Sequence, residues 1–131
     1  AAIAQLIWMC ARGEPEQGQV AVAWTVLNRT RQARVHLKKS GAVHPIFGNG
    51  SIEAACLSHG LLGGRSCPWS DFSDRMYCRA LSIACLSLCA DLGDPTQGAT
   101  HFHDHLISPG WSKGRRPVAL IGRHFFYRQI C

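Results

Sequence analysis

Apolar residues recur at helical spacing in three stretches of this chain. Residues 1–10 carry isoleucine and leucine three or four positions apart, and residues 16–34 repeat valine, alanine and leucine with the same period. Residues 75–91 hold an unbroken apolar stripe that stops before Gly93 and Pro95. Such spacing places the apolar side chains on one face of a helix. The pattern therefore predicts three amphipathic helices.

Turn-forming residues separate these helices. Residues 12–15 form a short polar turn that ends in a proline, which suits the start of a helix. Residues 35–50 and 60–74 are rich in glycine, proline and serine, which is typical of loops. Between the two loops, residues 51–58 predict a short helix capped by Ser51.

The last third of the chain has strand-like patterns. Residues 98–105 alternate and predict an extended segment. Residues 118–121 and 124–127 are two short apolar runs around Gly122-Arg123, which predicts a β-hairpin. The expected fold is therefore α+β and mainly helical, with a short C-terminal β-hairpin.

Length and composition describe one globular domain over residues 1–131. Hydrophobic residues make up 47% of the chain and charged residues 17%, which excludes a disordered segment. No apolar run approaches the roughly 18 residues that a membrane span needs, so no membrane segment is expected. No basic leader with a cleavage site is visible, so no signal peptide is expected either.

The chain is basic, with a formal net charge of +6. Five Lys and Arg residues lie between positions 29 and 39 without an acid, and no acid follows Asp104. A surface of this kind is either simply solvated or attracts a polyanion. Aromatic residues are not interleaved with the basic ones and no nucleic-acid motif is present, which favours a bacterial cell wall over nucleic acid.

Seven cysteines are many for a chain of 131 residues. An even set of six suits three disulfides and hence an oxidising compartment, with Cys10 as the odd thiol. The six are Cys56, Cys67, Cys78, Cys85, Cys89 and Cys131.

The stretch MCARGEPEQGQVAVAWTVLNR, residues 9–29, resembles the opening motif of the SleB-like cell wall hydrolases, the spore cortex-lytic enzyme family. In that motif an EARGE block is followed by a GQVAVA…VLNR helix. Residues 11–14 match the block, whereas Cys10 stands where the family has its first glutamate.

Further blocks of the same family follow in the same order. A DPTxGAxxxH block is matched at Asp94, Pro95, Thr96, Gly98, Ala99 and His103. A tryptophan is matched at Trp111, and a terminal IGxHxFY pair of strands at Ile121, Gly122, His124, Phe126 and Tyr127. The family's QFSCW loop is matched only in part, at Ser66, Cys67 and Trp69.

The resemblance implies a small lysozyme-like domain that cleaves the glycan strands of peptidoglycan, as a muramidase or a lytic transglycosylase. It implies that position 10 is the general acid site, and it suggests Ser66, Trp69, His103 and Tyr127 as substrate-binding residues. No metal and no cofactor are expected. Trp69, Trp111 and Tyr127 are either sugar-stacking platforms or ordinary packing residues.

A glycosidase needs a proton donor for the departing glycosidic oxygen, and a carboxylic acid supplies it well. A thiol with a pKa of about 8.5 is a poor donor, so the Cys10 form is expected to be severely weakened. Cys10 is either an engineered replacement of the glutamate or a natural change. Glu14 is either a residual acid or base, or a structural residue that binds backbone N–H groups at the second helix start or pairs with Arg12.

The same residues also fit other classes of protein. Cys10 with a base from His101, His103 or His105 would form a Cys–His peptidoglycan amidase or peptidase, although a thiolate is disfavoured at a helix C-terminus. The three histidines could instead bind zinc. The domain could also bind glycan without turnover.

A small basic wall hydrolase acts in the periplasm or after secretion. Such a protein would be a phage lysin or an interbacterial toxin. A toxin would have a cognate immunity protein as a partner.

Overall fold

The protein is described by a computed structural model that covers residues 2–57, 75–89 and 91–128. Its elements in chain order are α1 (Ala2–Ala11), α2 (Glu16–Ser40), α3 (Ile52–Leu57), α4 (Arg75–Leu88), β1 (His101–Asp104), the 3₁₀ helix η2 (Gly110–Ser112), β2 (Ala119–Ile121) and β3 (His124–Tyr127). The prediction of a mainly helical α+β fold with a small C-terminal sheet is confirmed.

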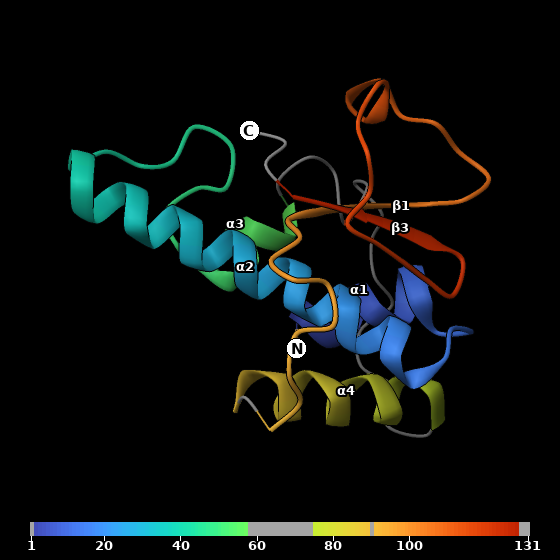
Figure 1. Cartoon of the computed structure of the whole chain (residues 1–131). Helices are drawn as coiled ribbons and strands as arrows, with labels where there is room; N and C mark the ends of the chain where they lie inside the picture. The colour runs from blue at the N-terminus through green and yellow to red at the C-terminus, as the bar shows by residue number, and fades with distance from the viewer. Residues whose placement is uncertain (1, 58–74, 90, 129–131) are drawn as a thin grey trace.

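Helix α2 is the central element of the fold. It packs against α1 and α4 on one side and touches β1 and β2 on the other, so that it separates α4 from the sheet (Figure 1). The apolar faces of these helices meet in one core, to which the sheet contributes Phe102 and Phe126. None of the helices in the described part of the chain has the length and apolar character needed to cross a bilayer.

The sheet has three antiparallel strands in the order β1-β3-β2. The predicted hairpin is confirmed as β2 and β3, joined at Gly122-Arg123. Of the segment 98–105, predicted as a strand or extended segment, residues 101–104 form a strand, which pairs with β3. Its register sets His101 opposite Tyr127 and His103 opposite Phe125.

Helix α2 is longer than its apolar pattern predicts, because it continues to Ser40 instead of ending near residue 34. The prediction of a loop was therefore wrong for residues 35–40. Two basic residues in the last turn favour the helix C-terminus, and Gly41 at φ 72° closes it by donating its N–H to the Leu37 carbonyl at 2.8 Å. The apolar period fades there because this part of α2 projects into solvent (Figure 1).

The short helix is confirmed as α3, and Ser51 Oγ accepts the Ala54 N–H at 3.1 Å as the predicted cap. The last helix ends at Leu88, three residues before the predicted end. Residues 60–74, predicted as a loop, lie outside the described residues.

The Asn28-Arg29 pair ties α2 to the segment that leads into the sheet. Asn28 Nδ2 donates to Asp94 Oδ2 and to the Ala99 carbonyl, both at 2.9 Å. Arg29 is 1% exposed, and its Nε donates to the Thr100 carbonyl. These two residues are polar and buried, and they link α2 to residues 94–100, the segment that leads into β1.

The prediction of three disulfides was wrong for the described cysteines. Cys56, Cys85 and Cys89 are free thiols, and no disulfide joins any of the five cysteines in the described ranges. Burial raises the pKa of the Cys56 thiol to about 12, so this group is an inert, protonated part of the core. Cys67 and Cys131 lie outside the described residues.

Candidate functional site

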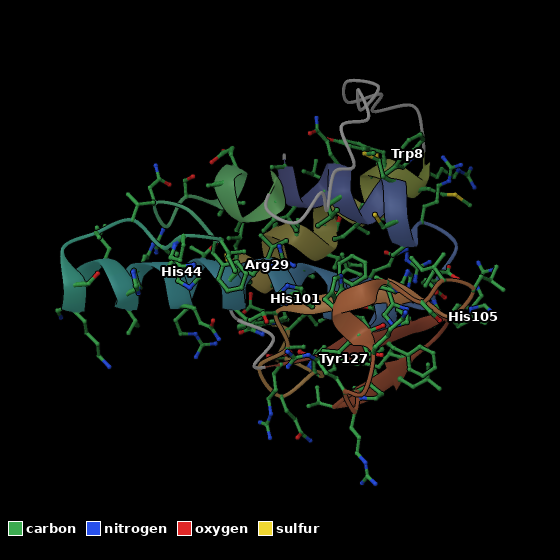
Figure 2. All side chains as sticks on the ribbon, turned by 90° about the horizontal axis from the view of Figure 1, so that it is seen from above. Trp8, Arg29, His44, His101, His105 and Tyr127 are labelled. Atoms are coloured by element: carbon green, nitrogen blue, oxygen red, sulfur yellow. The ribbon has the colours of Figure 1, made fainter. Side chains whose placement is uncertain are left out.

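Cys10 lies in the last turn of α1, next to the turn that leads into α2. The residue is half-buried and packs against the edge of the core. The nearby Arg12 guanidinium lies 4.4 Å from the ring centroid of Trp8, which belongs to the same helix (Figure 2). Position 10 is therefore accessible at the junction of two helices.

Glu14 occupies the same junction but faces the sheet. Its side chain is only 5% exposed, and Oε1 accepts the Arg123 backbone N–H at 2.9 Å. His124 Nδ1 lies 3.0 Å from the same oxygen, and the exposed Arg123 Nε lies 3.9 Å away. The carboxylate thus connects the α1–α2 turn to the hairpin turn between β2 and β3.

Gly122 makes this contact sterically possible. Its φ of 59° is in the left-handed region, and an added Cβ would come within 2.5 Å of Glu14 Oε2. Burial lowers the pKa of His124, and the Glu14 carboxylate opposes this shift without outweighing it. Glu14, Gly122 and His124 therefore form one close-packed unit.

A second cluster lies on the other face of the sheet, around His103 and Tyr127. His103 Nε2 lies 2.9 Å from the Tyr127 hydroxyl, and its Nδ1 lies 2.7 Å from the Asp104 carbonyl oxygen. The carbonyl can only accept, so Nδ1 carries the proton and Nε2 accepts the tyrosine O–H. Burial also raises the pKa of Tyr127, which keeps its hydroxyl protonated as the donor.

Trp111 completes this aromatic cluster. Its ring stands perpendicular to Tyr127 at 5.2 Å between centroids and lies 5.7 Å from His103 and 5.0 Å from His101. Trp111 is half-buried in η2, whereas His103 and Tyr127 are 8% and 5% exposed. Of the three rings, Trp111 is therefore the one that offers a surface to a ligand.

The structure brings some of the predicted site residues together but not all of them. His103 and Tyr127 are in direct contact, and Cys10 and Glu14 share one junction. Ser66 and Trp69 lie outside the described residues.

The three alternating histidines do not converge. His101 packs between Phe47 and Trp111 and is buried, whereas His105 lies past the end of β1 and contacts Asp104 at 3.3 Å (Figure 2). Within the described ranges, no group of histidine, cysteine or acidic side chains could hold a metal ion. The zinc alternative therefore finds no support in this part of the chain.

Sequence reasoning did not single out Arg123 and His124 as partners of Glu14, which is 109 positions away from Arg123. A signal was available, because Gly122 and His124 belong to the IGxHxFY block that carried the family resemblance. The spacing of that block could not tell which residue the turn would contact.

Helices packed around a central α2 and a small three-stranded antiparallel sheet make up the described fold. The family whose description is cell wall hydrolase matches residues 13–127, and the chain belongs to this family. Its class of activity is therefore hydrolysis of the peptidoglycan wall. No curated protein matches the chain significantly.

A solved structure gives the same fold. The crystal structure of the catalytic domain of the Bacillus cereus SleB protein is 20% identical to this chain, with a TM-score of 0.56. The similarity covers 95% of this chain and 84% of that one. Position 10 precedes the residues that the family match covers, so the match does not bear on Cys10.

Proposed function

We propose that this domain cleaves the glycan strands of peptidoglycan, as a muramidase or a lytic transglycosylase, with position 10 as its general acid site. The observation that carries the proposal is the half-buried place of position 10, at the helix junction four residues before the buried Glu14. A partly apolar setting is what raises the pKa of a carboxylic acid enough to donate a proton near neutral pH. With cysteine there, the proton donor is missing and the chain is weakened.

In this proposal Glu14 is a positioning residue. Its Oε1 is engaged by the Arg123 N–H and His124, so the carboxylate is directed at the hairpin turn and away from a substrate. Its role would be to hold the end of α1 against the sheet. A general acid must be placed within hydrogen-bond reach of the leaving oxygen, so this packing would set the geometry of position 10.

The aromatic cluster would bind the glycan. Trp111 offers a half-buried indole face of the kind on which sugar rings stack, and the rings of Tyr127 and His103 pack against it. Ser66 and Trp69 are proposed as further substrate contacts, on the family resemblance alone.

The decisive experiment restores the acid. We expect Cys10→Glu to release muropeptides from purified peptidoglycan at least about 100-fold faster than the Cys10 form, the usual contribution of a general acid. Cys10→Gln is the matched control, because glutamine has the same length as glutamate but no acidic proton, and this variant should stay inactive. Mass spectrometry of the products distinguishes anhydro ends from reducing ends, and hence transglycosylation from hydrolysis.

Other outcomes would select other functions. Cleavage of amide bonds by the Cys10 form, abolished in Cys10→Ser, would establish the amidase or peptidase instead. The engagement of both ring nitrogens of His103 argues against His103 as the base of that mechanism, because a base needs one of them for the thiol. Glycan binding without turnover in Cys10→Glu would establish a binding module.

The proposed setting is the periplasm or the cell exterior, where peptidoglycan is found. A phage lysin or an interbacterial toxin would both use a small basic domain of this type. For a toxin, the partner would be a cognate immunity protein. The test is to express Cys10→Glu in the bacterial periplasm. Cells should survive only when they also express the immunity protein.

A further inference from the structure

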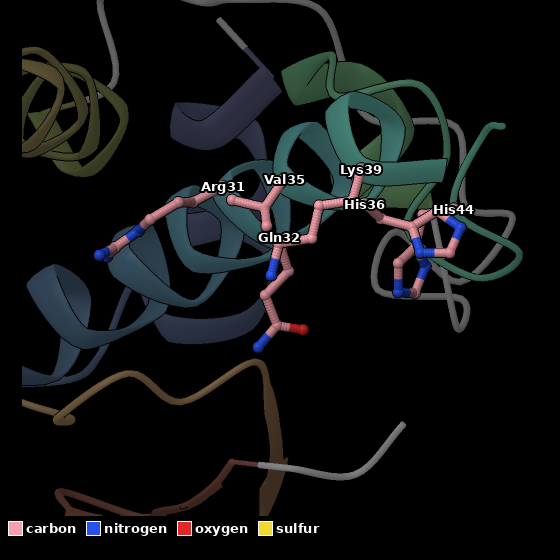
Figure 3. A pocket seen from close by; sticks show the side chains of 6 residues that line it. All are labelled: Arg31, Gln32, Val35, His36, Lys39 and His44. Carbon is pink, nitrogen blue, oxygen red and sulfur yellow. The ribbon is translucent and has the colours of Figure 1, made fainter. Parts of the chain in front are cut away.

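The solvent-facing end of α2 carries a surface pocket that has no part in the proposed cleavage. Its volume is about 340 Å³, and its walls are Arg31, Gln32, Val35, His36, Lys39 and His44. The first five residues recur along one face of the last turns of α2, and His44 comes from the segment after the helix (Figure 3).

The fold gives the pocket a defined end wall. Gly41 reverses the chain, and His44 forms an antiparallel bridge with Gly48. The His44 ring stacks on the buried Phe47 at 4.7 Å with an interplanar angle of 6°, and it meets the edge of His36 at 5.0 Å. His44 is therefore held in place before any ligand arrives.

The pocket offers several hydrogen-bond donors. His44 Nδ1 accepts the N–H groups of Ile46 and Phe47 at 3.1 and 3.0 Å, so the ring proton sits on Nε2. Burial and the neighbouring His36 lower the pKa of His44, which agrees with a neutral ring of this tautomer. Arg31 and Lys39 add a guanidinium and an ammonium group.

The last turns of α2 carry no acid of their own, and Arg31 is linked to the Asp94 carboxylate through Asn28, whose Nδ2 donates to Asp94 Oδ2 at 2.9 Å. The sequence has no Asp or Glu between Glu16 and Glu53. Arg31 Nη2 donates to Asn28 Oδ1 at 2.8 Å, which fixes the direction of the guanidinium through a neutral amide. Guanidinium and ammonium groups with N–H donors beside them are the chemistry that proteins use for phosphate.

We propose that this pocket binds the phosphodiester groups of an anionic polymer attached to the cell wall and so holds the domain on its substrate. The proposal depends on the proposed function for the choice of partner, because a wall hydrolase meets such polymers where its glycan lies. A nucleic acid offers the same phosphates. However, the pocket has no aromatic side chain other than its two histidines on which bases could stack, so the wall polymer is favoured.

The test measures binding of the full chain to poly(glycerol phosphate) by calorimetry at low salt. The double substitution R31Q and K39Q removes two charges from the pocket while keeping the side chains polar, and we expect it to weaken binding by at least about 10-fold. The matched control is K113Q with R116Q, which removes the same charge from the exposed segment after η2 and should change affinity less than about 2-fold.

Three results would overturn the proposal. The first is an equal loss of affinity in both double variants, because attraction would then be spread over the surface. The second is no measurable binding of the polymer by the wild-type chain. The third is binding of DNA, at equal phosphate concentration, that is as tight as binding of the polymer and equally sensitive to R31Q with K39Q.

Failure of this proposal can be told apart from failure of the proposed function. In the Cys10→Glu background, R31Q with K39Q should cleave polymer-free peptidoglycan at an unchanged rate and lose only its preference for walls that carry the phosphate polymer. Loss of cleavage on polymer-free peptidoglycan would contradict the separation of the pocket from the site. An inactive Cys10→Glu chain that still binds the polymer through the pocket would refute the glycosidase alone.

Discussion

Glu14 is an ionisable residue with 5% of its side chain exposed, and it lies against a hairpin turn from the other end of the chain. A buried carboxylate is stable only when it is paired and hydrogen-bonded. The Arg123 N–H supplies a hydrogen bond, His124 Nδ1 lies 3.0 Å from the same oxygen, and Gly122 supplies the space. The residue therefore stabilises the packing of α1 and α2 against the sheet.

Glu14→Gln is expected to lower the free energy of unfolding by about 2 kcal/mol, because it removes a buried charge from its partners and leaves His124 without a carboxylate. Urea denaturation followed by circular dichroism measures this change. Glu16→Gln, two positions on and exposed, is the control and should cost less than about 0.5 kcal/mol. Equal losses in the two variants would contradict the role assigned to Glu14.

At the scale of elements, Asp94 fixes how α2 meets the segment before β1. Its carboxylate accepts the Thr96 N–H at 2.8 Å, the Gly98 N–H at 3.0 Å and Asn28 Nδ2 at 2.9 Å. Burial by itself would raise the pKa of Asp94, but these hydrogen bonds outweigh it and hold the pKa below its usual value. Ionised Asp94 is thus the form that fits the fold.

The depressed pKa makes this contribution depend on pH. Because the folded state binds the proton less well than the unfolded state, the stabilisation is complete above the unfolded pKa of about 4 and is lost as pH falls through the lower folded pKa. Asp94→Asn should therefore be less stable than the wild type by about 1–2 kcal/mol at pH 7, and the difference should shrink below about pH 4. Denaturation at a series of pH values tests this, with the exposed Asp91→Asn as the control. A difference that does not change with pH would refute the linkage.

At the scale of the whole molecule, the described cysteines do not cross-link the fold through disulfides. Helices α1, α2 and α4 enclose a continuous apolar core, and Cys56 is a fully buried member of it. A core of this kind, in a chain of 131 residues, can be stable without cross-links. The cysteine count had suggested the opposite, because counting cannot separate a buried thiol from half of a disulfide.

At least five of the seven cysteines should react with a thiol reagent in denaturant, because five of them are not in disulfides. The count is taken on protein purified without reductant, and unfolded reduced protein sets the value for seven. A single reactive thiol would support the three-disulfide framework and contradict the structure.

The sequence by itself determined the helices, the hairpin and the family. These features depend on interactions between residues that are close in sequence, so they can be recognised without knowing the fold. Examples are the apolar period of the helices, the cap by Ser51 and the Gly122-Arg123 turn. The end of α2 was missed because its last turns face solvent and are not marked by an apolar period. There, basic residues and the Gly41 cap decide where the helix stops.

Only the tertiary structure decided which residues act together. Glu14 with His124 and His103 with Tyr127 are pairs whose members come from different elements. Register and packing bring them together, and neither is set by the spacing within a motif. The type of each side chain was visible in the sequence, but its partner was fixed only when α2 packed between the other helices and the sheet.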